Sequence, residues 1–206
     1  MRESPAPLPR RAAIGLALVL ALGGCSTGVA GTAAPDPAAL ASPTSDAPQP
    51  DPSGDTFDDA RGRFGIVPPP GWSVDGSGVR GTAVVFTEPE ATALEAGPFR
   101  ATINVFVTRA AGDLPATVAG AREELKALTG YRPTADEPVV LGDGTQAHLI
   151  GGTFAAPESG IPLRNLQLFT VHEDSTVFVT GTSLLERWDA YGPVFDTSLR
   201  TLTVAA

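Results

Sequence analysis

The residue types that could support catalysis or metal binding are few, and their spacing is unfavourable. The two histidines, His148 and His172, have no cysteine or H-E-x-x-H pattern near them, whereas zinc needs three or four converging ligands. We expect His172, followed by Glu173 and Asp174, at the exposed end of a hairpin. A Ser-His-Asp triad assembled in space stays open, but no serine occupies a G-x-S-x-G elbow. The sequence therefore predicts no catalytic residue, no metal site and no cofactor.

One further pattern, Gly76-Ser-Gly-Val-Arg-Gly81, has the G-x-G-x-x-G spacing of dinucleotide-binding loops. Such a loop works when it leaves a strand and opens a helix, whose first N–H groups bind the pyrophosphate. Here a strand-like run, Ala83-Val-Val-Phe86, follows instead. We interpret the pattern as a loop between two strands.

Cys25 is the only cysteine and follows a segment with the features of an export signal. An arginine-bearing head precedes an uncharged run over residues 12–22, and two glycines separate that run from the cysteine. This arrangement is typical of a secretory signal, and the run is shorter than the roughly 18 residues of a membrane-spanning helix. The alternative is a chance cysteine beside an ordinary cleavage site.

Leu22-Gly-Gly-Cys25 resembles the bacterial lipobox, in which the cysteine thiol receives diacylglycerol and the chain is cut just before it. The resemblance implies that residues 1–24 are a lipoprotein signal peptide and that acylated Cys25 is the mature N-terminus. The protein would then lie on the extracytoplasmic face of the cell membrane, held by its acyl chains. Each buried methylene contributes about 0.8 kcal/mol to such anchoring.

The acidic composition excludes two classes of partner. The sequence has 23 acidic and 14 basic residues and a net charge of −9. A negative surface repels phosphate backbones and anionic lipid headgroups, so we expect no nucleic-acid binding and no electrostatic adsorption to membranes. A single cysteine also excludes an intrachain disulfide, so the fold must depend on its apolar core.

The composition changes near residue 60. Residues 25–60 are rich in Ala, Pro, Ser, Thr, Gly and Asp, with Phe57 as the only aromatic residue, which predicts a disordered tether. From residue 61 to 206, β-branched and aromatic runs alternate with Gly and Pro, and this length suffices for one globular domain.

The globular part is predicted to contain more strand than helix. Asp113 is expected to cap a first helix, and Ser183-Leu-Leu-Glu186 has a capping-box pattern for a second, which Gly192-Pro193 should kink or divide. Asp143-Gly144 and Glu173-Asp174 are typical of tight hairpin turns. Strand runs with inserted helices favour an α+β fold with a mainly antiparallel sheet. The predicted strands cover residues 63–67, 73–75, 83–87, 101–109, 138–141, 145–154, 164–171 and 176–182.

Aromatic and amide side chains are the remaining candidates for ligand binding. Trp72, Trp188 and Tyr191 could line an apolar groove, but their positions favour packing in the core. Asn165 and Gln167 lie on a polar strand face that could serve binding, although outward-facing polar residues are ordinary in sheets. The sequence does not identify the ligand-contacting residues.

The segment Phe64-Gly-Ile-Val-Pro-Pro-Pro-Gly-Trp72 is similar to the first strand and Pro-Gly-Trp turn of Mog1/PsbP-like domains. With the lipobox and the Ala/Pro-rich leader, the chain resembles the LpqN/LpqT-type lipoproteins of mycobacteria and their relatives. The resemblance implies an α/β/α sandwich, no known enzymatic activity and a role in the transport of envelope lipid or glycolipid. It also implies membrane lipid exporters and secreted acyltransferases as partners.

We therefore hypothesise a non-catalytic, membrane-anchored binding module of the cell envelope. A secreted hydrolase that uses His148 or His172 is one alternative. A purely structural envelope protein, recognisable by a solid interior without a pocket, is the other.

Overall fold

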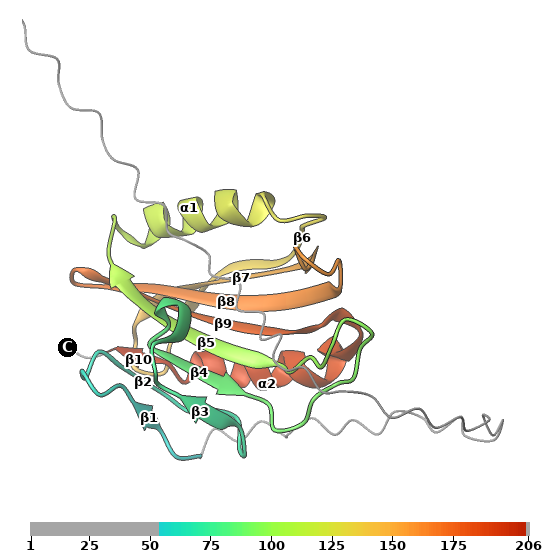
Figure 1. The fold of residues 1–206 in the computed structure, drawn as a ribbon. Coiled ribbons are helices and arrows are strands. Elements are labelled where there is room, and N and C mark those ends of the chain that lie inside the picture. The colour runs from blue at the N-terminus through green and yellow to red at the C-terminus, as the bar shows by residue number, and fades with distance from the viewer. Residues whose placement is uncertain (1–53, 205–206) are drawn as a thin grey trace, which may run out of the picture.

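A seven-stranded antiparallel sheet with the order β3-β4-β5-β9-β8-β7-β6 forms the centre of the fold (Figure 1). The computed structural model describes residues 54–204. A smaller sheet with the order β1-β2-β10 lies beside it. The strands are β1 Phe57–Asp58, β2 Phe64–Ile66, β3 Ser73–Asp75, β4 Val84–Thr87, β5 Thr102–Arg109, β6 Arg132–Val140, β7 Gln146–Ala155, β8 Pro162–His172, β9 Ser175–Leu184 and β10 Thr203–Val204.

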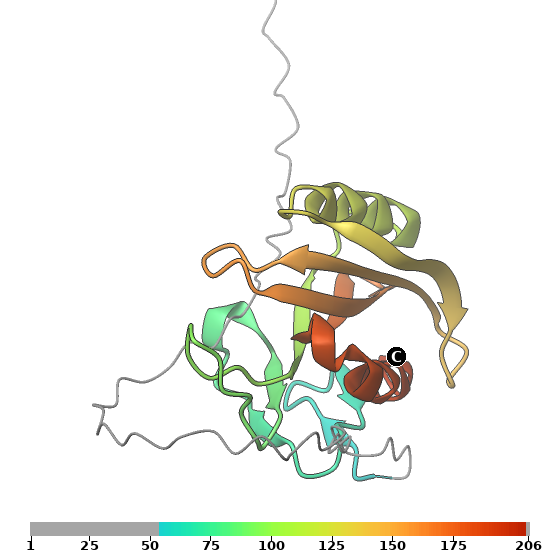
Figure 2. The ribbon, with the colours of Figure 1, turned by 90° about the vertical axis from the view of Figure 1, so that its right-hand side faces the viewer.

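Two helices cover opposite faces of the large sheet, α1 over Leu114–Lys126 and α2 over Trp188–Arg200 (Figures 1 and 2). The arrangement confirms the predicted α+β fold, an α/β/α sandwich around a mainly antiparallel sheet. Single 3₁₀ turns, η1 Val79–Gly81 and η2 Leu185–Arg187, lie in the β3–β4 loop and before α2. The strands β6 to β9 follow one another as a meander.

Helix α1 begins where the sequence predicted. The Asp113 side chain accepts a hydrogen bond from the Ala116 backbone N–H at 2.9 Å, which satisfies one of the free donors of the first turn. The buried face of the helix, with Val118 and Leu125, packs on Phe106 and neighbouring aromatic rings of the sheet.

Helix α2 begins at Trp188, so the prediction of a capping box at Ser183 is wrong. Ser183 still belongs to β9, which pairs with β8 as far as Leu184, and its hydroxyl donates to the Leu184 carbonyl. The predicted division at Pro193 is also absent, because α2 runs uninterrupted to Arg200. The packing of its buried face stabilises the helix, although Pro193 has no backbone N–H to donate.

The face of the sheet beneath α2 carries a continuous apolar core. Trp72 and Tyr191 are buried, as predicted, and their rings meet Phe195 at centroid distances of 6.3 and 6.1 Å. Gly181 of β9 lies directly under Phe195, where a methyl group would come within 2.5 Å of the ring. Trp188 is half-buried and packs under the Arg164 guanidinium at 4.4 Å.

The hairpin turns are confirmed. Most strand boundaries lie within two residues of the prediction, but β6 begins six residues earlier than predicted and β1 was not predicted. Gly144 has φ +88° in the β6–β7 turn, and Glu173 has φ +48° in the two-residue β8–β9 turn. Strand β6 begins at Arg132 although it contains two prolines, which an edge strand tolerates. Phe57 forms part of β1 and contacts Phe86 at 5.5 Å, so ordered structure begins before the predicted boundary at residue 61.

Candidate ligand-binding site

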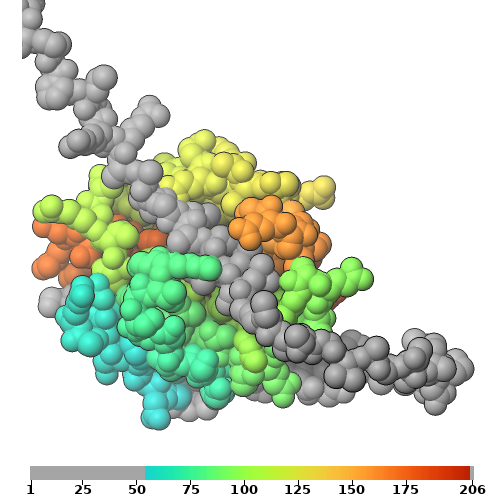
Figure 3. All heavy atoms as spheres, in the orientation of Figure 1, coloured from blue at the N-terminus to red at the C-terminus, as the bar shows by residue number. Residues whose placement is uncertain are grey.

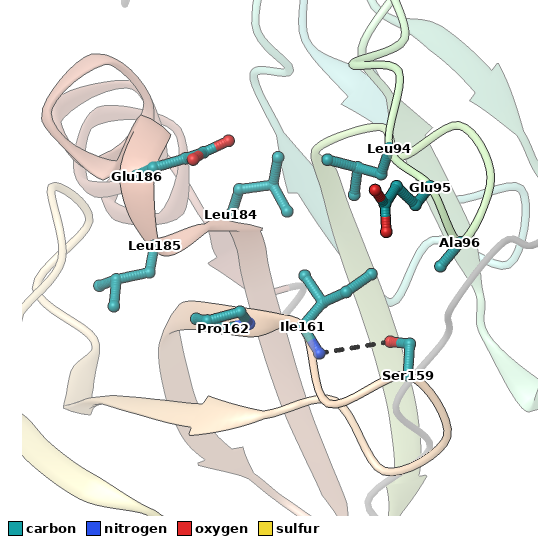
Figure 4. Close-up of a pocket in the computed structure, with 9 residues that line it drawn as sticks. All are labelled: Leu94, Glu95, Ala96, Ser159, Ile161, Pro162, Leu184, Leu185 and Glu186. Atoms are coloured by element: carbon teal, nitrogen blue, oxygen red, sulfur yellow. Dashed lines mark hydrogen bonds between the residues drawn. The ribbon is translucent and has the colours of Figure 1, made fainter.

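A cavity of about 570 Å³ opens at one end of the large sheet, and three chain segments line it (Figure 4). They are the connection between β4 and β5, the β7–β8 turn and the junction of β9 with η2. The first two appear in green and orange at the right-hand end of the molecule (Figure 3). The lining residues are Leu94, Glu95, Ala96, Ser159, Ile161, Pro162, Leu184, Leu185 and Glu186.

The interior of the cavity is apolar. Leu94, Ile161 and Leu184 point toward one another, one from each segment (Figure 4). Behind them lies a buried cluster that includes Phe154 and Leu163. Cavities of 300–1,000 Å³ with mainly apolar walls are typical sites for small organic ligands. The cavity is therefore the candidate binding site.

The wall formed by the β4–β5 connection is held in place by its own hydrogen bonds and by Arg187. The backbones of Thr92 and Phe99 exchange two hydrogen bonds, of 2.7 and 2.9 Å, which close the tip of the loop. Arg187 of η2 donates to the Thr92 hydroxyl at 2.7 Å. This bond ties the wall to the junction that forms the opposite side of the cavity.

A buried carboxylate, Glu88, anchors the base of the same wall. It accepts hydrogen bonds from the Tyr191 hydroxyl of α2 and from the Ala101 backbone N–H, the latter at 2.7 Å, and Arg187 lies 3.5 Å away. Burial, together with the nearby Glu88 carboxylate, raises the pKa of Tyr191 above its usual value. Tyr191 thus stays protonated as a donor, and the network clamps α2 to the cavity wall.

A band of uncharged polar side chains crosses β5, β9 and β8 next to the cavity. Asn104 of β5, Thr180 of β9 and Gln167 of β8 are register partners and form one row across the three strands. Thr102, Thr182 and Asn165 form a second row in the same way. We call these residues the polar band. All are buried, with exposed fractions between 1 and 7%. The members are Thr102, Asn104, Asn165, Gln167, Thr180 and Thr182.

The polar band continues directly into the cavity lining. Alternate residues of a strand share a face, so Thr182 lies on the same face as Leu184, which lines the cavity. Asn165 likewise lies on the same face of β8 as Leu163, and Leu163 pairs with Leu184 of β9. The band thus separates the cavity from the phenylalanine cluster under α1, on one face of the sheet.

Three atoms of the polar band have no hydrogen-bond partner in the described structure: Asn104 Oδ1, Gln167 Oε1 and Asn165 Nδ2. A buried polar atom left unpaired costs about 1–3 kcal/mol. Two of these atoms are acceptors and one is a donor. Each acceptor needs a separate donor, so at least two ligand hydroxyls, which both donate and accept, would be required to pair with all three.

The two histidines lie apart from the cavity. His148 Nε2 is 2.7 Å from Asp136 Oδ1, and Arg122 of α1 makes two hydrogen bonds to the same carboxylate, of 2.8 and 2.7 Å. These bonds, that of Arg122 foremost, lower the pKa of Asp136 to about 2. Within residues 54–204 no serine hydroxyl bonds to either histidine, and this cluster ties α1 to β6 and β7.

His172 and the glycine-rich segment have the predicted positions. His172 ends β8 at the hairpin, but it is half-buried rather than exposed, and its Nε2 atom is buried without a partner in the described chain. Gly76–Gly81 forms the β3–β4 loop, as predicted, and lines a second cavity of about 520 Å³ with the β1–β2 loop. Strand β4 follows this loop, as the sequence predicted, where a dinucleotide-binding loop would open a helix.

The described residues contain neither a cluster of metal ligands nor a membrane-spanning helix. Residues 54–204 contain no group of three or more metal-ligating side chains. In the same range, neither helix has the length and apolar character needed to cross a membrane. Cys25 and the predicted signal peptide lie outside the described residues.

Two members of the polar band, Asn165 and Gln167, were recognised in the sequence as a polar strand face, but their burial and their partners on β5 and β9 were not predicted. In β8, Asn165 and Gln167 lie between Leu163 and Phe169 on one face, and β9 repeats the pattern with two threonines. Of the two interpretations of this face, binding or an ordinary outward-facing surface, the second is wrong, because Asn165 and Gln167 are each only 1% exposed. Polar pairs enclosed by apolar residues on adjacent strands are the signal that would have identified them. The cavity itself depends on how three loops meet, which no local pattern encodes.

Comparison with known proteins establishes the fold as Mog1/PsbP-like. The solution structure of cyanobacterial PsbP from Synechocystis has a TM-score of 0.53 at 14% identity and covers 73% of this chain and 92% of its own. The Ran-binding protein Mog1p of Saccharomyces cerevisiae has a TM-score of 0.51 at 16% identity, with 73% and 94% coverage. The fold implied by the Phe64–Trp72 resemblance is confirmed.

Within this fold, the chain is similar to LpqN of Mycobacterium tuberculosis, a protein described as involved in cell envelope biogenesis. The TM-score is 0.59 at 15% identity, and the match covers 74% of this chain and 90% of LpqN. At such identities the likeness concerns the fold. No protein-family model and no curated protein sequence matches the chain.

Proposed function

We propose that the protein is a non-catalytic accessory module of the cell envelope that binds an amphiphilic lipid or glycolipid. The observation that carries the proposal is the apolar cavity continuous with the buried polar band. An alkyl chain would occupy the cavity among Leu94, Ile161 and Leu184. A ligand hydroxyl would pair with the free amide atoms of the band where the side chains that bury them move aside on binding.

Two further features support an envelope role. The fold is similar to that of LpqN, whose description concerns cell envelope biogenesis. The lipobox-like Leu22-Gly-Gly-Cys25 would attach the protein to the membrane from which such a ligand comes. Membrane lipid exporters and secreted acyltransferases would then supply or receive the ligand. Mass spectrometry of the native protein tests the anchor, because an unacylated N-terminus would contradict it.

Ligand binding is tested by titrating the full chain with dodecyl maltoside below its micellar concentration, using calorimetry. A Cys25→Ser background prevents acylation. Ala96 lines the cavity, and Ala96→Trp should fill it and weaken binding at least tenfold. Ala93→Trp is the matched control, because residue 93 lies in the same exposed loop but does not line the cavity.

Only one pattern of results supports the proposal. The unsubstituted chain and Ala93→Trp should bind alike, and Ala96→Trp should bind weakly. No binding by the unsubstituted chain, or equal binding by all three proteins, would contradict the cavity as the site.

A further inference from the structure

We propose that Glu95 and Glu186 make the mouth of the cavity a charge filter, which selects amphiphiles with uncharged or cationic heads and rejects anionic ones. The inference rests on the proposed function and assigns the class of ligand to the same site. It is carried by the positions of two carboxylates and by where the neighbouring arginines point.

The two carboxylates stand on opposite walls of the cavity. Glu95 belongs to the β4–β5 connection and Glu186 to η2, and both side chains flank the apolar residues between them (Figure 4). Both residues are exposed. Within the described residues neither takes part in a salt bridge or a side-chain hydrogen bond. Their charges are therefore uncompensated where a ligand would enter.

The arginines nearest in sequence do not neutralise the mouth. Arg187 is bound to the Thr92 hydroxyl and lies 3.5 Å from Glu88, with its guanidinium over the Tyr191 ring. Arg100 donates to the backbone carbonyl of Glu88 at 2.9 Å and to that of Pro89. Both guanidinium groups hold the base of the wall, and no basic residue lines the cavity.

An anionic head at the mouth would approach two carboxylates, Glu95 and Glu186, with no basic residue among the lining residues to compensate them. Because an identical alkyl chain gains the same apolar burial whatever its head, the head alone decides among such ligands.

The filter is tested with three probes that share a twelve-carbon chain and differ in the head: maltoside, trimethylammonium and carboxylate. The full chain with Cys25→Ser is titrated below the micellar concentrations at pH 7.5 and low salt. Two like charges at this range in a partly solvated site should weaken binding of the carboxylate about tenfold relative to the maltoside. The trimethylammonium probe should bind at least as tightly as the maltoside.

Two double variants separate a local filter from the overall negative charge. Glu95→Gln/Glu186→Gln removes the two mouth charges and should bring carboxylate and maltoside binding to within about twofold. Glu123→Gln/Glu137→Gln removes two charges from α1 and β6, away from the cavity, and should keep the tenfold difference. Raising the ionic strength to 0.5 M should shrink the difference in the unsubstituted chain, since exposed charges are then screened.

The outcomes distinguish this inference from the proposed function. Equal binding of the three probes by the unsubstituted chain, or an equal loss of selectivity in both double variants, would overturn the filter while leaving a lipid-binding cavity. If no probe binds, the proposed function itself fails. The filter stands if selectivity is present and only the mouth variant removes it.

Discussion

The two faces of the central sheet differ in how their layers are filled. Under α2 the core is continuous, with Phe195 and Leu199 wholly buried against the strands. Under α1 the apolar side chains form two separate clusters, and the polar band lies between them. Close packing of large apolar groups is the main source of stability, whereas unpaired buried amides reduce it. The α2 face thus contributes most to stability, and the α1 face has the less complete packing that the proposed function requires of a ligand site.

The largest loss of stability is expected from a substitution at the centre of the core beneath α2. Phe195→Ala should lower the free energy of unfolding by about 3–5 kcal/mol, because it removes a ring that contacts Trp72, Trp188 and Tyr191. Urea unfolding measures the loss. Dodecyl maltoside affinity of the protein that remains folded should stay unchanged, and a loss of affinity would contradict the division between the two faces.

A smaller effect is expected from added volume at two glycines on opposite faces. Gly181→Ala forces the buried Phe195 ring to move and should cost about 1–3 kcal/mol. Gly152→Ala meets Tyr131, which is only half-buried and can shift toward solvent. Thermal unfolding should therefore show the larger decrease for Gly181→Ala. Equal decreases would indicate that the two faces are packed alike.

A substitution in the polar band should leave the free energy of unfolding unchanged or raise it, in contrast to the substitutions above. Gln167→Met removes a buried amide whose oxygen has no partner, so stability should be unchanged or rise by about 1 kcal/mol. Affinity for dodecyl maltoside should fall. Thr170→Val is the control in the same strand: its hydroxyl donates to the Gln146 carbonyl at 2.9 Å, so this change should destabilise by about 1 kcal/mol without affecting binding. If Gln167→Met destabilises as well, the band is structural.

Local rules predicted most of the fold. Alternation in 101–109 marked β5, Asp113 marked the start of α1, and Asp143-Gly144 marked a hairpin, because each depends on neighbouring residues. The start of α2 was misplaced because the pairing of β9 with β8 continues through Ser183 and overrides a capping pattern. The first half of β6 was missed because its prolines are tolerated only at the edge of a sheet, and edge position is a property of the whole topology.

The candidate site was harder to predict than the fold. Its cavity brings together residues near positions 95, 160 and 185, and no pattern within one segment signals that meeting. The burial of Asn165 and Gln167 likewise depends on neighbouring strands with the same arrangement of polar residues. The anchor at Cys25 is the converse case: a purely local motif, which stays a prediction because it lies outside the described residues.

The smallest effect is expected where α1 is tied to the sheet. The pKa of Asp136 is about 2 in the folded protein, against an ordinary value of 3.8, because Arg122 and His148 bind its charged form. The resulting stabilisation is complete above about pH 4 and is lost as the pH falls toward 2. Since 39% of the Asp136 side chain is exposed, screening limits it to roughly 1 kcal/mol. The hydrogen bond that holds α2 to the cavity wall, from the Tyr191 hydroxyl to Glu88, is by contrast buried.

Acid should therefore loosen the two layers unequally. The difference in unfolding free energy between the unsubstituted chain and Asp136→Asn should be roughly 1 kcal/mol at pH 7 and should shrink toward zero near pH 2. Hydrogen exchange at pH 2–3 should show earlier loss of protection in α1 than in α2. The surface carboxylate of Asp136 holds α1 by bonds of 2.7–2.8 Å, whereas the ion pair of α2 with Glu137 of β6 is longer, at 3.8 Å. A difference independent of pH, or simultaneous exchange of both helices, would show that the ion cluster contributes nothing and that α1 is held by its apolar face alone.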